Sequence, residues 1–224
     1  MKVLDRAVAV LTAVAEGERD VSGIAAATGV PRSTAHRLLR SLREHRLVDE
    51  DEESGLVVGS WVHELGAVAN SGALARVAPD VVELLCAHTR LSVQLYQRRS
   101  DRVECLVAAS PVSGLRDVVE TGTVIPLGGD AASQVLTAWD DRPAVAGGPG
   151  EALRRVRSRG WALTEEADSH IVLSVPVRAA SRRVVAALSL SGPPRLRKDA
   201  ARLRGQLRKA AEALENELRG AWPE

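Results

Sequence analysis

Aromatic residues are scarce in this sequence: four Trp, one Tyr and no Phe among 224 residues, or 2% of the chain. The core must therefore be built from Leu, Val and Ala. The scarcity also disfavours modules that bind single-stranded nucleic acid by stacking bases on aromatic side chains. The two cysteines, Cys86 and Cys105, are too few for a disulfide framework and are typical of a reducing compartment.

Long hydrophobic runs are also missing. No uncharged run reaches the roughly eighteen residues that a membrane-spanning helix needs, and no apolar segment typical of a secretion signal follows Lys2. We therefore expect a chain that has no membrane partner, is not secreted and lies in the cytoplasm. An apolar fraction of 45% and a charged fraction of 26% indicate a globular protein, and the length suffices for one large domain or two modest ones.

Charge is unevenly distributed along the first part of the chain. Five arginines and a single acidic residue, Glu44, lie between Arg32 and Arg46. Five acidic residues, Asp49 to Glu53, follow almost at once. A basic stretch next to an acidic one means that one part of the surface attracts polyanions and the neighbouring part repels them.

The N-terminal part is predicted to form a small helical unit with a strand pair. An apolar stripe predicts a first helix that ends at Gly17. The pattern then predicts helices at 22–28 and 31–45, strands at 47–48 and 56–58, and a helix at 62–70. Ser71-Gly72 after that helix is typical of a linker between domains.

The second and third predicted helices have the pattern of a helix-turn-helix. Ala25 allows a close helix crossing, Gly29 suits the turn, and Ala35 and Leu38 face the core. The side of the third helix that lies off this apolar stripe carries groups suited to base edges and phosphates: Arg32, Ser33, Thr34, His36, Arg37 and Arg40. The N-terminal amides of that helix are further phosphate donors. The alternative is an ordinary helical hairpin with a solvated, arginine-rich side.

The remainder of the chain mixes strands and helices without strict alternation. Strands are predicted at 92–98, 102–109, 115–119, 171–178 and 184–190, and helices at 131–139, 151–159 and 198–218. This order favours an α+β fold class over a doubly wound parallel sheet.

Residues 4–69 resemble the winged-helix domain of the IclR family of transcription regulators, above all the stretch from Gly29-Val30-Pro31 to Leu39. Gly122 to Leu127 and Val184 to Pro193 resemble later motifs of the same family. The resemblance implies three parts. They are a winged helix-turn-helix DNA-binding domain at 1–60, a linker helix at 61–72, and a GAF-like effector-binding domain with a curved antiparallel sheet at 73–224.

Further motifs resemble one branch of that family. Ser92 to Tyr96, Ser113 to Asp117 and Ala132 to Leu136 are similar to the NdgR-type branch of actinobacteria. That branch is associated with control of amino-acid biosynthesis, the leucine genes in particular. The resemblance implies a repressor that binds a pseudo-palindromic DNA operator as a homodimer or tetramer. An amino acid or its precursor would be the small-molecule effector, and no cofactor is implied.

The resemblance also implies the residues that hold the effector. They are Leu115, Asp130, Ala131, Ala132, Ser133, Gln134, Ser189 and Ser191. Alternate residues of a strand share a side, so Ser189 and Ser191 project together and their hydroxyls can bind a carboxylate or an amine. The alternative is that both serines only bond neighbouring backbone. In that case the C-terminal domain would be a dimerisation platform without a ligand.

Two departures from the family pattern stand out. Family wings usually carry a basic residue, whereas the turn here is acidic from Asp49 to Glu53, so we expect this wing not to approach phosphates closely. Ser133-Gln134 stands where the broader family often has Gly-Lys. The pocket is therefore expected to be less charged than in relatives that bind small oxoacids.

Metal and catalytic sites find little support. Cys86 and His88 are two residues apart on a predicted helix and point to different sides, and Cys105 lies in an apolar strand. His170 follows Asp168 and Ser169, but sequence adjacency does not supply the geometry of a nucleophilic triad. No metal site is predicted, and an enzyme is the least favoured class.

Overall fold

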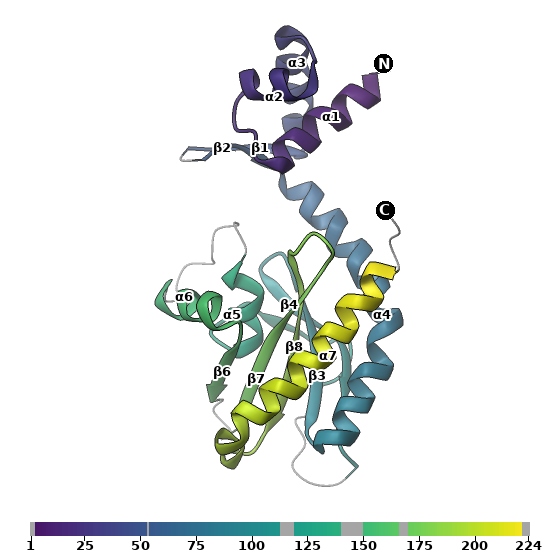
Figure 1. Ribbon diagram of the computed structural model, residues 1–224, viewed down its shortest axis with the longest axis vertical. Helices are drawn as coiled ribbons and strands as arrows, with labels where there is room; N and C mark the ends of the chain where they lie inside the picture. The colour runs from purple at the N-terminus through teal and green to yellow at the C-terminus, as the bar shows by residue number, and fades with distance from the viewer. Residues whose placement is uncertain (1–2, 53, 113–118, 140–149, 166–169, 221–224) are drawn as a thin grey trace. The chain divides into compact units, whose positions relative to one another are not determined.

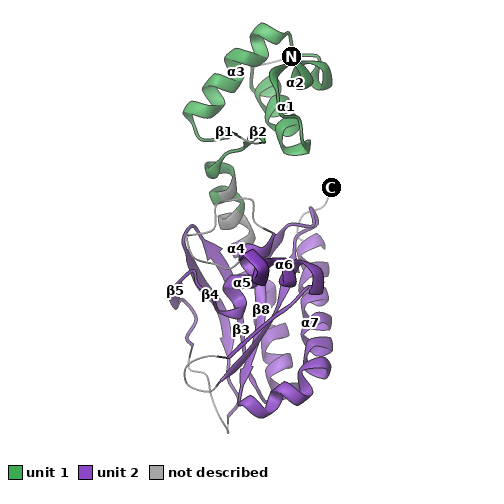
Figure 2. Cartoon of the chain, turned by 90° about the vertical axis from the view of Figure 1, so that its left-hand side faces the viewer, with its two compact units in different colours: residues 1–66 green, residues 67–224 purple. Residues whose placement is uncertain are grey.

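The chain divides into two compact units. The computed structural model describes residues 3–52, 54–112, 119–139, 150–165 and 170–220. One unit comprises the residues up to Gly66 and the other those from Ala67 on, as Figure 2 shows by colour. This boundary lies inside the 61–72 segment that is expected to link the domains, and each unit has a hydrophobic core of its own.

The first unit contains three helices followed by a two-stranded antiparallel sheet. Its elements are α1 (Val3–Glu16), α2 (Val21–Thr28), α3 (Arg32–Glu44), β1 (Val48–Asp51) and β2 (Gly55–Val58). Apolar side chains of every element meet in one core, among them Val10, Ile24, Leu39, Val48 and Leu56. These elements agree with the predicted helices and strand pair, including the apolar stripe of α3.

Local chemistry sets the ends of α2. The Asp20 carboxylate accepts hydrogen bonds from the backbone N–H groups of Ser22 at 2.7 Å and Gly23 at 2.9 Å, which caps the helix. These hydrogen bonds lower the pKa of Asp20, and the bond from Gly23 contributes more than the bond from Ser22. At the other end Gly29 adopts φ 67°, and its N–H donates to the carbonyl of Ala25. The chain then turns into α3 directly after Pro31.

Helix α4 (Ser60–Thr89) is much longer than predicted. The prediction of a helix that ends at 70, with a linker at Ser71-Gly72, is wrong. The helix continues through Ser71 and Gly72 and has a total length of 30 residues. Serine and glycine each weaken a helix interior by up to about 1 kcal/mol relative to alanine. Burial of Leu74, Ala78 and Val82 along the second half of α4 outweighs that cost.

The second unit is an α+β domain around a six-stranded antiparallel sheet of order β5-β4-β3-β8-β7-β6. The strands are β3 (Ser92–Arg99), β4 (Arg102–Ala109), β5 (Val124–Pro126), β6 (Ala162–Glu165), β7 (Ile171–Arg178) and β8 (Val184–Gly192). The helices are α5 (Ala131–Ala138), α6 (Gly150–Arg159), the 3-10 turn η1 (Pro194–Asp199) and α7 (Ala200–Gly220). Four predicted strands are confirmed, β5 and β6 were not predicted, and the strand expected at 115–119 lies largely outside the described residues.

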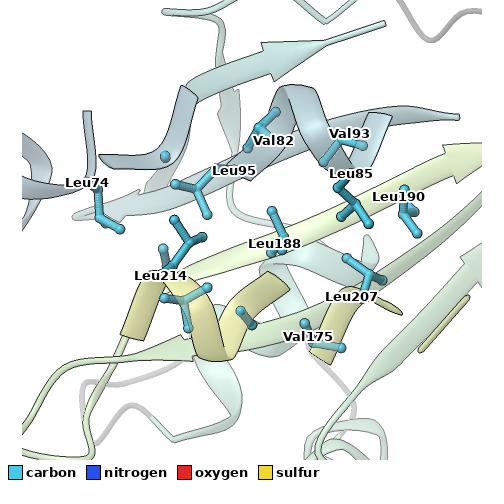
Figure 3. Close-up of a cluster of buried hydrophobic side chains, with 14 of the residues drawn as sticks. Leu74, Val82, Leu85, Val93, Leu95, Val175, Leu188, Leu190, Leu207 and Leu214 are labelled. Carbon is cyan, nitrogen blue, oxygen red and sulfur yellow. The ribbon is translucent and has the colours of Figure 1, made fainter. Parts of the chain in front are cut away.

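Helices cover both sides of this sheet. On one side α7 and the second half of α4 pack on the central strands (Figure 1). The close-up shows Leu74 and Val82 of α4 and Leu214 of α7 directed toward Leu95 and Leu188 of the sheet (Figure 3). On the other side α5 packs on β7 and β8, and α6 packs on α5. The residues that follow an alternating pattern along β3, β7 and β8 therefore face two different layers.

Candidate nucleic-acid interface and ligand site

Helix α3 has one buried and one exposed side. Ala35, Leu39 and Leu42 are buried in the core of the first unit. The predicted contact residues Arg32, Ser33, His36, Arg37 and Arg40 are all exposed, and Thr34 is half-buried. The structure thus brings all six to the solvent side or the margin of a single helix, which is the arrangement that insertion into a major groove requires.

Ion pairs divide the arginines of this region into two groups. Arg40 pairs with Glu44 at 3.4 Å, and Arg43 pairs with Glu50 at 2.6 Å. Arg46 pairs with Glu64 at 3.7 Å and lies 5.8 Å from the centre of the Trp61 ring. Among the described residues, neither Arg32 nor Arg37 makes an ion pair. The N-terminal half of α3 therefore carries the guanidinium groups that are available to phosphates.

The first turn of α3 has no side-chain cap. Pro31 precedes this turn, and no side chain accepts a hydrogen bond from its backbone N–H groups, whereas the Asp20 carboxylate caps the start of α2. The Ser33 hydroxyl and the Arg32 guanidinium lie at this end of the helix. Uncapped N-terminal amides carry a partial positive charge and suit an anion. The turn therefore offers amide, hydroxyl and guanidinium donors together.

The strand pair β1–β2 presents carboxylates to solvent. Asp49 accepts a hydrogen bond from the backbone N–H of Ser60, and Asp51 accepts two from Ser54. Of these acidic residues, Glu50 pairs with Arg43 of α3. The carboxylate partner of Arg46 is instead Glu64 of α4, the helix that follows β2 directly.

The predicted effector residues around α5 form a closely bonded helix start. The Asp130 carboxylate accepts from the N–H of Ser133 at 2.9 Å and also from its hydroxyl. The same hydroxyl accepts from the N–H of Gly128, and the Gln134 amide donates to the carbonyl of Gly129. Ala131 and Ala132 are buried next to this loop, while Leu115 lies outside the described residues.

Ser189 and Ser191 lie on the side of β8 that faces α5, and both are fully buried. The hydroxyls of Ser189 and Ser174 are 2.7 Å apart, and the Gln94 amide donates to Ser191 at 3.3 Å. The alternative, in which these serines only bond neighbouring backbone, does not hold, since their partners are side chains of the strands on either side. Sequence reasoning missed Gln94 and Ser174 as members of this group.

We call Ser92, Gln94, Ser174, Ser189 and Ser191 the polar cluster. In the sheet Ser189 lies opposite Gln94 on β3 and Ser174 on β7, while Ser191 lies opposite Ser92. The alternate residues of the same strands fill the other side of the sheet with Val, Leu and Ala. A buried polar group costs free energy unless it is bonded, and Gln94, Ser174, Ser189 and Ser191 meet this requirement by bonding to one another across the strands.

The described residues hold no group of three or more His, Cys, Asp and Glu side chains suited to a metal ion. Cys86 is buried and His88 exposed on α4, so they point to different sides as predicted. Burial raises the pKa of the Cys86 thiol. Across the described helices, no stretch combines the length and the apolar character of a membrane span.

Comparison with known proteins agrees with this architecture. A family model described as the IclR helix-turn-helix domain matches residues 3–52, and one described as the bacterial transcriptional regulator IclR C-terminal domain matches residues 150–216. The glycerol operon regulatory protein of Streptomyces griseus is 31% identical, over 85% of this chain and 84% of that protein. The chain belongs to the IclR family of bacterial transcriptional regulators.

Other relatives of IclR type extend the comparison. The glycerol operon regulatory protein of Streptomyces coelicolor is 34% identical over 61% of this chain and 56% of its own length. A crystal structure of an IclR regulator from Alicyclobacillus acidocaldarius matches with a TM-score of 0.56 at 24% identity, covering 96% of this chain and 98% of that one. An IclR homologue from Microbacterium hydrocarbonoxydans, solved with 4-hydroxybenzoate, matches with a TM-score of 0.55 at 23% identity, covering 98% and 100%. These structures share the fold. As a member of the IclR family, the protein is a DNA-binding transcription regulator.

Proposed function

We propose that this regulator is a repressor whose α3 reads its operator in the major groove. The observation that carries the proposal is the exposed side of α3, where Arg32 and Arg37 make no ion pair among the described residues. Arg37, in the second turn of α3, would reach a base edge or a phosphate. Ser33, Thr34 and His36 would add neutral donors and acceptors. The protein would act in the cytoplasm, where the chromosome lies.

The operator is expected to be pseudo-palindromic because the protein would bind it as a homodimer, or as a tetramer of two dimers. Apolar side chains on α1 support an association of this kind: Val3, Leu4 and Val8 are more than half exposed. A two-fold pair of α3 helices contacts half-sites about 34 Å apart, or one helical turn of DNA.

The DNA-binding proposal can be tested on a duplex selected by the full-length protein from a random-sequence library. Arg37→Ala should weaken binding to this duplex at least about fivefold in fluorescence anisotropy, as loss of a bidentate base contact costs about 1–3 kcal/mol. Arg202→Ala, which removes the same charge from an exposed position on α7, is the matched control and should change little. Equal affinities of wild type and Arg37→Ala would remove α3 from the proposal.

We further propose that a small-molecule effector binds on the α5 side of the sheet. The polar cluster supports this site, because the opposite side of the same strands is apolar. Asp130, Ser133 and Gln134 lie at the start of the helix that covers this side. The resemblance to the NdgR-type branch favours an amino acid of leucine metabolism or its precursor. The names of the Streptomyces relatives favour glycerol or its phosphorylated form as a second candidate.

A ligand-free dimerisation platform is the alternative for the second unit. The observation that favours it is that the hydroxyls of Ser189 and Ser191 already have partners in Ser174 and Gln94. A ligand would have to replace these hydrogen bonds, which are buried.

Calorimetry distinguishes the two possibilities. Leucine, its biosynthetic precursors, glycerol and glycerol phosphate are titrated into the full-length protein and into Ser189→Val. The proposal expects heat with one of them, reduced at least tenfold in affinity by Ser189→Val, and a matching loss of repression control in a reporter strain. If no compound gives heat and the variant regulates as the wild type does, the platform is favoured.

A further inference from the structure

Arg43 and Glu50 form the shortest ion pair of the first unit among the described residues. Arg43 lies in the last turn of α3 and Glu50 in β1, and their charged atoms are 2.6 Å apart. Their side chains are 50% and 54% exposed, so the pair is on the surface. The pair links the end of the candidate DNA-reading helix to the wing.

The charge around this pair is negative. Glu44, Asp49, Asp51 and Glu52 are exposed beside Glu50, whereas no acidic residue occurs from Arg32 to Ser41. The arginines of this end, including Arg40 and Arg46, already have carboxylate partners. A phosphate backbone that approaches the wing therefore meets carboxylates, and one that approaches the start of α3 meets unpaired guanidinium groups.

We propose that Glu50 is a specificity-determining residue that withholds Arg43 from DNA phosphates and so lowers the sequence-independent affinity for duplex DNA. This inference rests on the proposed function of α3. Sequence-independent binding arises from phosphate contacts and the counterions they release. Each arginine removed from phosphate contact weakens binding to every sequence, while base-edge contacts of the N-terminal half of α3 are left unchanged. Operator binding then depends on base contacts to a larger extent.

The experiment measures binding of the full-length protein to a mixed-sequence duplex between about 50 and 200 mM KCl by fluorescence anisotropy. Glu50→Gln should bind more tightly, and its salt dependence should steepen by about one unit per protomer in contact. Over that salt range its affinity should fall about threefold further than that of the wild type for each added contact. In the wild-type background, Arg43→Gln should change the affinity for the duplex little. In the Glu50→Gln background, it should abolish the gain in affinity.

Glu212→Gln is the matched control, because it removes the same charge from the exposed Arg208–Glu212 pair on α7. It should leave the salt dependence unchanged. A steeper salt dependence in this control, an unaltered one in Glu50→Gln, or a loss for Arg43→Gln as large as that for Arg37→Gln would overturn the inference. Failure of the proposed function itself has a different signature, namely that Arg37→Gln binds the duplex as the wild type does.

Discussion

The backbone conformation of a single residue, Gly29, sets the direction in which the chain runs from α2 to α3. Its φ of 67° lies in the left-handed region, and its N–H caps α2 by donating to the Ala25 carbonyl. The direction of the turn decides which side of α3 meets the core. The exposure of Arg32 and Arg37 therefore depends on a residue that lies outside α3.

Gly29→Ala tests this dependence. No atom lies within 4 Å of the added Cβ, so the cost is that of the backbone conformation alone, about 1 kcal/mol. Gly205→Ala, in the open, helical interior of α7, should instead stabilise by about 0.5–1 kcal/mol. Urea unfolding followed by circular dichroism measures both changes. A neutral or stabilising Gly29→Ala would contradict the left-handed turn.

The paired hydroxyls of Ser174 and Ser189 give a second prediction for individual residues. Ser189→Ala removes one hydroxyl and leaves the other buried without its partner, which should cost about 1–3 kcal/mol of unfolding free energy. In the double variant with Ser174→Ala neither hydroxyl remains, so the total loss should be smaller than the sum of the single losses. Additive losses in a double-mutant cycle would show that the two hydroxyls do not interact.

Among the elements, α4 matters most because it is the one that crosses the boundary between the units. Its continuity through Ser71-Gly72 predicts that Gly72→Ala, at an exposed helical position with open space around the Cβ, stabilises the protein by about 1 kcal/mol. Urea unfolding of the full-length chain provides the measurement. Destabilisation on this substitution would indicate a hinge with non-helical backbone.

The elements that could be predicted are those whose own sequence carries a clear period. The stripe of α3 and the alternation along β3, β7 and β8 are local signals, and these elements were found within a few residues of their bounds. The strand β5 has three residues and ends in Pro126, and β6 has four, so neither is long enough for a period. The length of α4 was not predicted because the Ser71-Gly72 pair is typical of a helix end. Burial of residues farther along the helix outweighs this local preference.

The candidate sites differ in the same way. All six α3 residues lie on one helix, so helical spacing sufficed to group them. The polar cluster joins Gln94, Ser174 and Ser189 from three strands far apart in the sequence, and only strand register brings them together. A weak signal existed, because Gln94 and Ser174 each stand between apolar residues in a strand, but it did not reveal their partners.

At the scale of the whole molecule, the two units carry different candidate sites. The first has a basic helix start and an acidic wing, which in the proposed function would direct DNA to the start of α3. The second has a sheet with an apolar layer on each side, and on the α5 side this layer surrounds the polar cluster, the candidate ligand site. In the proposed repressor, α4 is the chain connection through which a ligand in one unit would influence the other.

The central claim is that the exposed side of α3 enters the major groove. Guanine N7 atoms lie in that groove, so dimethyl sulfate protection of the selected duplex tests the claim most directly. We predict two protected regions about ten base pairs apart, both lost with Arg37→Ala and retained with Arg202→Ala. Stable binding without protection of any guanine N7, or protection that survives Arg37→Ala, would contradict the account.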